Sequence, residues 1–145
     1  MKAAVIYATK TGHSKKIADA IAGEIKVPAL DIASRPKLDD VDLLFIVGGI
    51  YGGKSIPELL EYLRGLDAST VREAVLITSC VSKIAKQEEV RNLLAEKNIR
   101  VSEEEFTCQG SFLFFGRKHP DPTDLENSVK FAKAQYTNYI DNANS

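Results

Sequence analysis

The alternation of short apolar runs with helix-spaced apolar residues constrains the fold of this chain more than any other feature. Residues 3–8 (AAVIYA) and 41–47 (VDLLFIV) are nearly continuous apolar runs, which are typical of strands buried on both faces of a sheet. Residues 14–25 instead place Ile17, Ile21 and Ile25 on one stripe of a helix. Strands that alternate with helices favour a parallel sheet covered by helices on both faces. The sequence therefore predicts a doubly wound α/β fold.

The pattern along the chain predicts elements in the order β-α-β-β-α-β-α-β-α. The expected strands occupy residues 3–8, 27–32, 41–47 and 74–78, with a fifth strand inside 105–115. The expected helices occupy residues 14–25, 55–66, 88–97 and 123–140, and capping-box spacing marks the start of the second and the last helix at Ser55 and Thr123. Only residues 34–40 connect the second and third strands, whereas a parallel crossover usually needs about a dozen residues. We therefore expect either a tight crossover there or strand ends that differ from the predicted ones.

Composition and charge narrow the classes of partner. The chain has 145 residues and a formal net charge of −1, so it lacks the basic surface that non-specific nucleic-acid binding needs. No apolar run approaches the roughly 18 residues of a transmembrane helix, and the apolar stretch at the N-terminus is too short for a signal peptide. The two cysteines, Cys80 and Cys108, are too few for a disulfide framework. We expect one domain spanning residues 1–145, in the cytoplasm, with neither a membrane nor a nucleic acid as its partner.

The loop after the first strand has the chemistry of an anion site. It consists of Thr9, Lys10, Thr11, Gly12, His13 and Ser14. The loop offers three hydroxyls and no carboxylate, and it leads into a helix N-terminus, whose unpaired N–H groups and positive dipole end favour phosphate. Gly12 permits a positive φ or a close backbone approach. The alternative is that Thr11 or Ser14 only caps the helix. No second histidine or cysteine lies near His13 in the sequence, so no metal site is predicted.

A second loop matches the P-loop pattern of nucleotide-binding proteins. Residues 48–55 (GGIYGGKS) fit G-x-x-x-x-G-K-S between a strand and a helix. However, no later apolar strand ends in an acidic residue that could hold magnesium. Pro57 also removes an N–H group near the place where the phosphate cradle needs donors. A P-loop is therefore the weaker interpretation of these residues.

Three segments together resemble the flavodoxin family. Residues 9–14 resemble the phosphate-binding signature T-x-T-G-x-T/S, and residues 49–54 resemble the flavin-contacting loop of a flavodoxin-domain subfamily. The segment CQG at 108–110, with residues 119–120 and 124–127, resembles the C-terminal region of that subfamily. The resemblance extends over nearly the whole chain. It implies a flavodoxin-like three-layer sandwich with a five-stranded parallel sheet of order 2-1-3-4-5, and FMN bound without a covalent link.

The resemblance also implies which residues contact the flavin ring, while the first loop binds its phosphate. The implied ring contacts are Gly49, Ile50, Tyr51, Gly52 and Gly53 in the second loop and Ser79, Cys80 and Val81 in the third. Tyr51 is expected to stack on the ring or to contact its edge, the alternative being a half-buried loop aromatic. The third loop is expected to contact the pyrimidine edge of the ring through its backbone. Many flavodoxins cover the second ring face with an aromatic residue of the third loop, but this chain has none between Val71 and Arg100. No catalytic side chain is implied, because the flavin supplies the chemistry.

The function implied by the resemblance is electron transfer between two redox partner proteins, a donor reductase and an acceptor enzyme. A monomer is expected, with a dimer as the alternative. Flavodoxins are usually strongly acidic, which steers basic partners, so the net charge of −1 departs from the family. The first alternative is an NAD(P)H-dependent FMN or quinone reductase on the same fold, although such enzymes are generally longer. The second is a binding module that kept the fold and lost the flavin, since fold does not fix function.

Overall fold

The computed structural model describes residues 2–9, 12–51, 54–80, 87–109 and 122–143, with backbone alone at 50–51, 54–55, 79–80, 108–109, 122–124 and 143. Helices and strands alternate along the chain. In order they are β1 (Ala3–Tyr7), α1 (His13–Ile25), β2 (Ala29–Asp31), the 3-10 helix η1 (Ile32–Ser34), β3 (Val41–Tyr51), β4 (Lys54–Ser55), α2 (Pro57–Arg64), β5 (Val71–Cys80), α3 (Glu88–Glu96), β6 (Arg100–Val101), β7 (Phe106–Gln109) and α5 (Pro122–Ala143). Within these residues, no helix is both long enough and apolar enough to cross a membrane.

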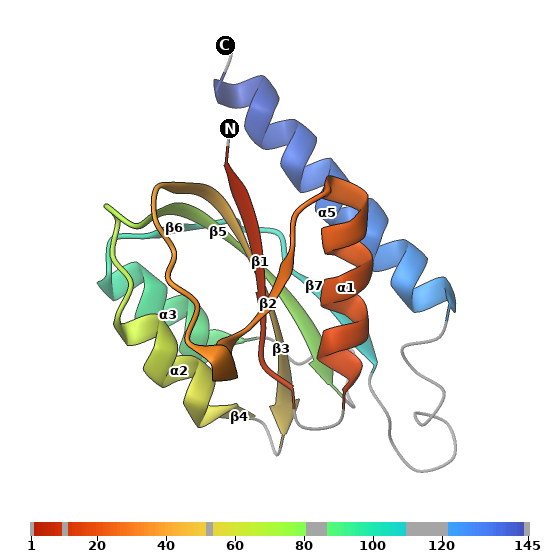
Figure 1. The fold of residues 1–145 in the computed structure, drawn as a ribbon, viewed down its shortest axis with the longest axis horizontal. Helices are drawn as coiled ribbons and strands as arrows, with labels where there is room; N and C mark the ends of the chain where they lie inside the picture. The colour runs from red at the N-terminus through yellow and green to blue at the C-terminus, as the bar shows by residue number, and fades with distance from the viewer. Residues whose placement is uncertain (1, 10–11, 52–53, 81–86, 110–121, 144–145) are drawn as a thin grey trace.

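The sheet has the strand order β2-β1-β3-β5-β6, and all four of these pairs are parallel (Figure 1). This order confirms the predicted topology. The fifth position of the sheet holds two short strands, because β6 pairs with the start of β5 and β7 pairs with residues 77–80 at its end. The sequence placed only the second of these, β7. A further addition is β4, which pairs antiparallel with the end of β3.

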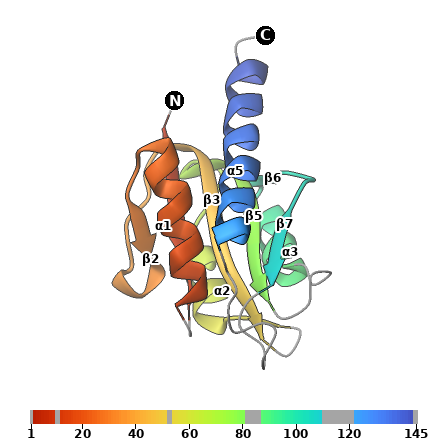
Figure 2. The same ribbon diagram turned by 90° about the vertical axis from the view of Figure 1, so that its right-hand side faces the viewer.

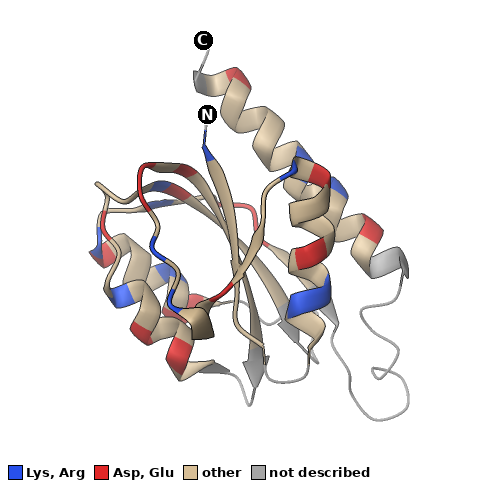
Figure 3. Ribbon diagram, in the orientation of Figure 1, with Lys and Arg blue, Asp and Glu red and all other residues tan. Residues whose placement is uncertain are grey.

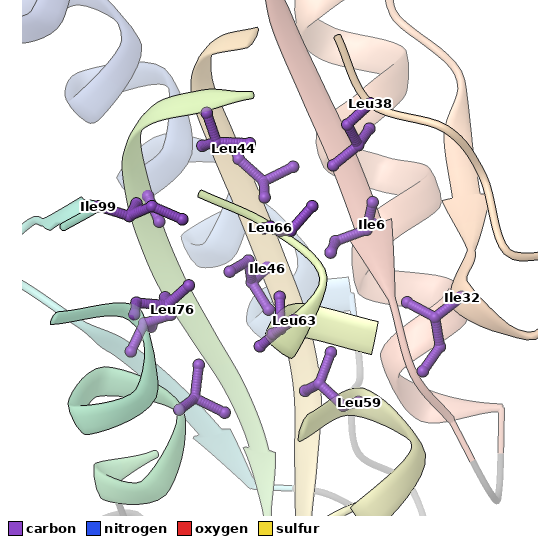
Figure 4. Packing of buried hydrophobic residues seen from close by; sticks show 14 of the residues in the cluster. Ile6, Ile32, Leu38, Leu44, Ile46, Leu59, Leu63, Leu66, Leu76 and Ile99 are labelled. Carbon is purple, nitrogen blue, oxygen red and sulfur yellow. The ribbon is translucent and has the colours of Figure 1, made fainter. Parts of the chain in front are cut away.

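Helices cover both faces of the sheet, as Figure 2 shows from the side of α1 and α5. On that face, α1 and α5 pack over Val5, Phe45 and Ile77. On the other face, α2 and α3 pack over Leu44, Ile46 and Leu76, together with Leu59 and Leu63 of α2 (Figure 4). Consecutive residues of β3 therefore point into two different cores. This burial on both sides explains why the third strand reads as a continuous apolar run.

The crossover from β2 to β3 is as tight as its length predicts. The chain between these strands is described throughout and forms η1 but no α-helix. The Asp31 carboxylate begins η1 by accepting from the Ala33 N–H at 2.9 Å. Leu38 of the following segment is buried in the core, and the Tyr62 hydroxyl of α2 donates to the Pro36 carbonyl. Two buried side chains, Ile32 and Leu38, thus do the covering that a crossover helix normally does.

Both capping-box predictions are wrong. The first residue of α2 is Pro57, its N-cap is Ile56, and Ser55 pairs with Ile50 as part of β4. The extended pairing of β4 takes the backbone of Ser55 out of reach of the cap position, and proline is well suited to the first helical turn. The last helix begins at Pro122, so Thr123 lies inside it.

Candidate functional site

The three candidate segments converge on one edge of the sheet. The carboxyl ends of β1, β3 and β5 meet at this edge, and α1 begins there, as the lower part of Figure 1 shows. Ligands of doubly wound sheets bind beyond the carboxyl ends of the strands, at the point where the strand order reverses. Here that point lies between β1 and β3.

Thr9 and Gly12 shape the turn that leads into α1. The Gly12 N–H donates to Thr9 Oγ1 at 2.7 Å. Gly12 is the N-cap of α1 and has φ 90°, a left-handed conformation that L residues adopt only under strain. Thr9 therefore stabilises the turn through this hydrogen bond, and glycine at position 12 allows the positive φ that the turn requires. Lys10 and Thr11 lie outside the described residues.

Ser14 carries an unsatisfied hydroxyl at the start of α1. The residue is 1% exposed, and its Oγ has no hydrogen-bond partner among the described residues. The prediction that Ser14 could cap the helix is wrong, because Gly12 is the N-cap and Ser14 Oγ has no partner among the described residues. The same prediction for Thr11 lies outside the described residues. The first turn also contains no acidic residue, and Figure 3 shows basic residues there, which are Lys15 and Lys16. A buried donor beside uncapped N–H groups is the arrangement that binds an anion.

His13 is the first residue of α1 and is partly exposed. Partial burial lowers the pKa of its imidazole below the ordinary value of 6.5, and the positive charge of Lys16 lowers it further. Both effects disfavour the charged form. His13 is therefore mostly neutral at pH 7 in the ligand-free chain. Lys15 is paired with Asp19 at 2.8 Å, so the positive field at this edge comes from the helix terminus and Lys16.

Acidification is expected to destabilise the ligand-free protein through His13. Its folded pKa lies below its ordinary value of 6.5, so the unfolded chain takes up the proton first as the pH falls. The unfolding free energy of the wild type should therefore fall relative to that of His13→Gln as the pH drops through this value, with a constant difference at higher pH. Urea unfolding of both proteins from about pH 8 to about pH 5 measures this effect. Parallel curves over the whole range would contradict the lowered pKa.

The described part of the second candidate segment is a strand end and not a loop. Gly49, Ile50 and Tyr51 are the last residues of β3, and the chain returns in β4, where Lys54 pairs with Tyr51. Gly52 and Gly53 lie outside the described residues. A P-loop instead leads its Lys-Ser pair directly into the N-terminus of a helix. Because residues 54 and 55 are strand β4, the described backbone argues against the P-loop interpretation.

The third candidate segment is also a strand end, beside the second one. Ser79 and Cys80 are the last residues of β5, and they pair with Gly49 and Ile50 of β3. On their other side they pair with residues 108 and 109 of β7. The structure therefore brings the predicted second and third segments together as neighbouring strands. Val81 lies outside the described residues.

A cavity of about 280 Å³ beside Thr9 was not predicted from the sequence. It lies between η1 and α2, and its lining includes Asp31, Glu58 and Glu61, with Arg35 as the basic residue; Figure 3 shows the acidic residues of α2 near η1. Three carboxylates against one guanidinium disfavour a phosphate in this cavity. The sequence feature that could have indicated this cavity is Asp31, an acidic residue at the end of a predicted strand. Among the described residues, no group of three or more His, Cys, Asp or Glu side chains could hold a metal ion.

Comparisons with known proteins agree on the fold. The archaeal protein described as "Structure of a flavodoxin from the domain Archaea" superposes with a TM-score of 0.79 at 15% identity, covering 97% of this chain and 99% of the other. Oxidised flavodoxin 2 from Bacillus cereus gives a TM-score of 0.69 at 18% identity, covering 92% and 97%. An NAD(P)H:quinone oxidoreductase from Methanothermobacter marburgensis gives 0.61 at 9% identity, covering 90% and 97%. A comparison with curated protein sequences found no match.

These likenesses are below 25% identity and by themselves show the fold. The sequence profile described as "Flavodoxin domain" matches residues 4–113. This match includes β1 to β7, and with them all three segments at the carboxyl edge of the sheet. The chain therefore belongs to the flavodoxin domain family.

Proposed function

We propose that this protein binds FMN without a covalent link and carries electrons between a donor reductase and an acceptor enzyme. The observation that carries the proposal is the buried hydroxyl of Ser14, which lacks a partner among the described residues and lies at the uncapped N-terminus of α1. Buried polar groups in proteins are nearly always hydrogen-bonded, so an orphaned donor at a helix N-terminus calls for an anionic ligand. The phosphate of FMN is such a ligand. FMN is also the cofactor expected from the flavodoxin domain family, to which the chain belongs.

Each residue of the edge would have a defined role toward FMN. Ser14 Oγ and the N–H groups at the start of α1 would hold the phosphate, while Thr9 keeps the turn in place by accepting from Gly12. The neighbouring ends of β3 and β5, residues 49–51 and 79–80, would flank the ring with backbone groups. When bound, FMN supplies one- and two-electron transfer chemistry, so the chain needs no general acid or base.

FMN is expected to bind at least about 100-fold more tightly than riboflavin, because riboflavin lacks the phosphate and its charge-assisted hydrogen bonds. Fluorescence titration of the ligand-free protein with each flavin measures the ratio. Inorganic phosphate serves as the control, since it should compete with FMN and leave riboflavin binding unchanged. Equal affinities for the two flavins would show that the start of α1 does not bind the FMN phosphate.

The main alternative is an NAD(P)H-dependent FMN or quinone reductase. It shares the fold, as the superposition on the Methanothermobacter marburgensis oxidoreductase illustrates. The carboxylates that line the cavity beside Thr9 would repel the phosphates of a nicotinamide nucleotide there, which favours the carrier. Steady-state oxidation of NADPH with FMN-loaded protein and a quinone tests the choice: sustained turnover would support the reductase.

We further propose a monomer that works in the reducing cytoplasm, where two cysteines remain thiols.

A further inference from the structure

Gln87 connects α3, β5 and the segment before β7, close to the carboxyl ends of the strands where the flavin is proposed to bind. It is fully buried at the N-cap of α3. Its Nε2 donates to the Ile77 carbonyl of β5 at 3.1 Å, and its backbone N–H donates to Glu105 Oε1 at 3.0 Å, just before β7. The Glu105 side chain is 5% exposed and also pairs with Arg91 of α3 at 3.3 Å. These bonds fix the start of α3 to Ile77 near the end of β5 and to the residue that precedes β7.

The same amide group lies against β3. A Cβ atom built on Gly48 would be 3.1 Å from Gln87 Oε1 and 3.0 Å from Leu59 Cδ2, so the amide nearly touches the strand backbone. Gly48 pairs with Thr78 of β5. The Gln87 amide therefore covers the β3–β5 pair at the residues that immediately precede Gly49 and Ser79.

Stability alone does not explain a glutamine at this position. Gln87 Oε1 and the neighbouring Thr78 Oγ1 are both buried without a hydrogen-bond partner among the described residues. Unsatisfied buried polar atoms cost stability, and an apolar side chain of the same length would remove the unsatisfied Oε1 at the loss of only the bond to the Ile77 carbonyl. A local rule that is broken in this way is expected at functional sites.

We propose that Gln87 is a positioning residue for the flavin ring. It sets the spacing of the β3 and β5 ends, because its Nε2 holds the Ile77 carbonyl of β5 while its Oε1 packs against Gly48 of β3. This inference rests on the proposed FMN function. Binding groups must be held within about 0.5 Å of their productive geometry by the residues behind them, and Gln87 supplies that support for residues 49–51 and 79–80.

The test compares Gln87→Met with a matched control, Gln135→Met. Gln135 is also a buried glutamine with two side-chain bonds, to Ser102 Oγ and Glu104 Oε2, both at 2.9 Å. It lies near β6, which pairs with the start of β5, and so at the other end of the sheet. We expect Gln87→Met to weaken FMN and riboflavin by the same factor of about ten, since ring binding is common to both flavins. Gln135→Met should leave both affinities within about twofold.

A flavin-free measurement accompanies the titrations. Amide hydrogen exchange of the ligand-free proteins should be faster at residues 48–50 and 78–80 in Gln87→Met, and unchanged there in Gln135→Met. Gly48→Ala approaches the same contact from β3, and it should give the same riboflavin loss if Gln87→Met fails to fold. Wild-type flavin affinities in the folded Gln87 or Gly48 variant would overturn the positioning role. A wild-type protein that binds neither flavin would overturn the proposed function itself, and this inference with it.

Discussion

Replacing Ser14 with alanine is expected to weaken FMN binding by about 10- to 100-fold and to leave the ligand-free protein at least as stable as the wild type. A hydrogen bond to a charged group is worth about 1.5–3 kcal/mol, which accounts for the lost affinity. In the ligand-free chain the hydroxyl is buried without a partner among the described residues. Alanine removes that unsatisfied group, so folding loses nothing. FMN titration and urea unfolding of the ligand-free protein measure the two effects separately.

Ser128→Ala is the matched control for this substitution. Ser128 is another fully buried serine of a helix, but its Oγ donates to the Leu125 carbonyl at 2.8 Å within α5. Its replacement should cost about 1 kcal/mol of stability and leave FMN affinity unchanged. Opposite responses of the two serines would mark Ser14 as a ligand group. If Ser14→Ala keeps wild-type FMN affinity, the phosphate binds elsewhere.

The fold could be predicted because burial on both faces leaves a continuous apolar run, as in β1 and β3. The strand ends could not. Residues 48 and 49 are glycines, which are depleted in strands, and Ser79 follows the end of the predicted strand 74–78. They are extended because pairing continues to the end of both strands, with Gly49 opposite Ser79. Pairing between distant segments overrides local propensity here, and it turned two predicted loops into strand ends.

The candidate site shows the same division. Hydroxyls before a helix predicted an anion site, but Thr9 and Ser14 look equivalent in the sequence. Burial and hydrogen bonding separate them, since Thr9 accepts from Gly12 and Ser14 has no partner among the described residues. The role of Gln87 could not be predicted from its neighbours in the sequence. Its contacts are with Gly48 and Glu105, which are distant in the sequence and come close only in the folded chain.

Gly12 and Gly23 should respond to alanine with opposite signs, although both lie at α1. Among the described residues, no atom lies within 4 Å of a Cβ built on either residue, apart from the chain neighbours and the helix backbone. Neither substitution therefore introduces a clash with the rest of the described chain, and the difference between the two variants reflects the backbone conformation alone. Gly23 is an exposed residue inside the helix, where alanine is expected to raise the unfolding free energy by about 0.5–1 kcal/mol. Gly12 has φ 90°, so alanine there is expected to lower it by about 1–2 kcal/mol.

The flavin affinities make the comparison a test of the site as well as of the backbone. If alanine pulls residue 12 toward negative φ, the turn that begins with the Thr9–Gly12 hydrogen bond has to rearrange, and the donors at the start of α1 leave their places. Gly12→Ala should therefore weaken FMN at least about tenfold and leave riboflavin nearly unaffected, because only FMN uses the phosphate donors. Gly23→Ala should change neither affinity. A Gly12→Ala protein that loses stability but keeps its preference for FMN over riboflavin would show that the phosphate does not depend on this turn.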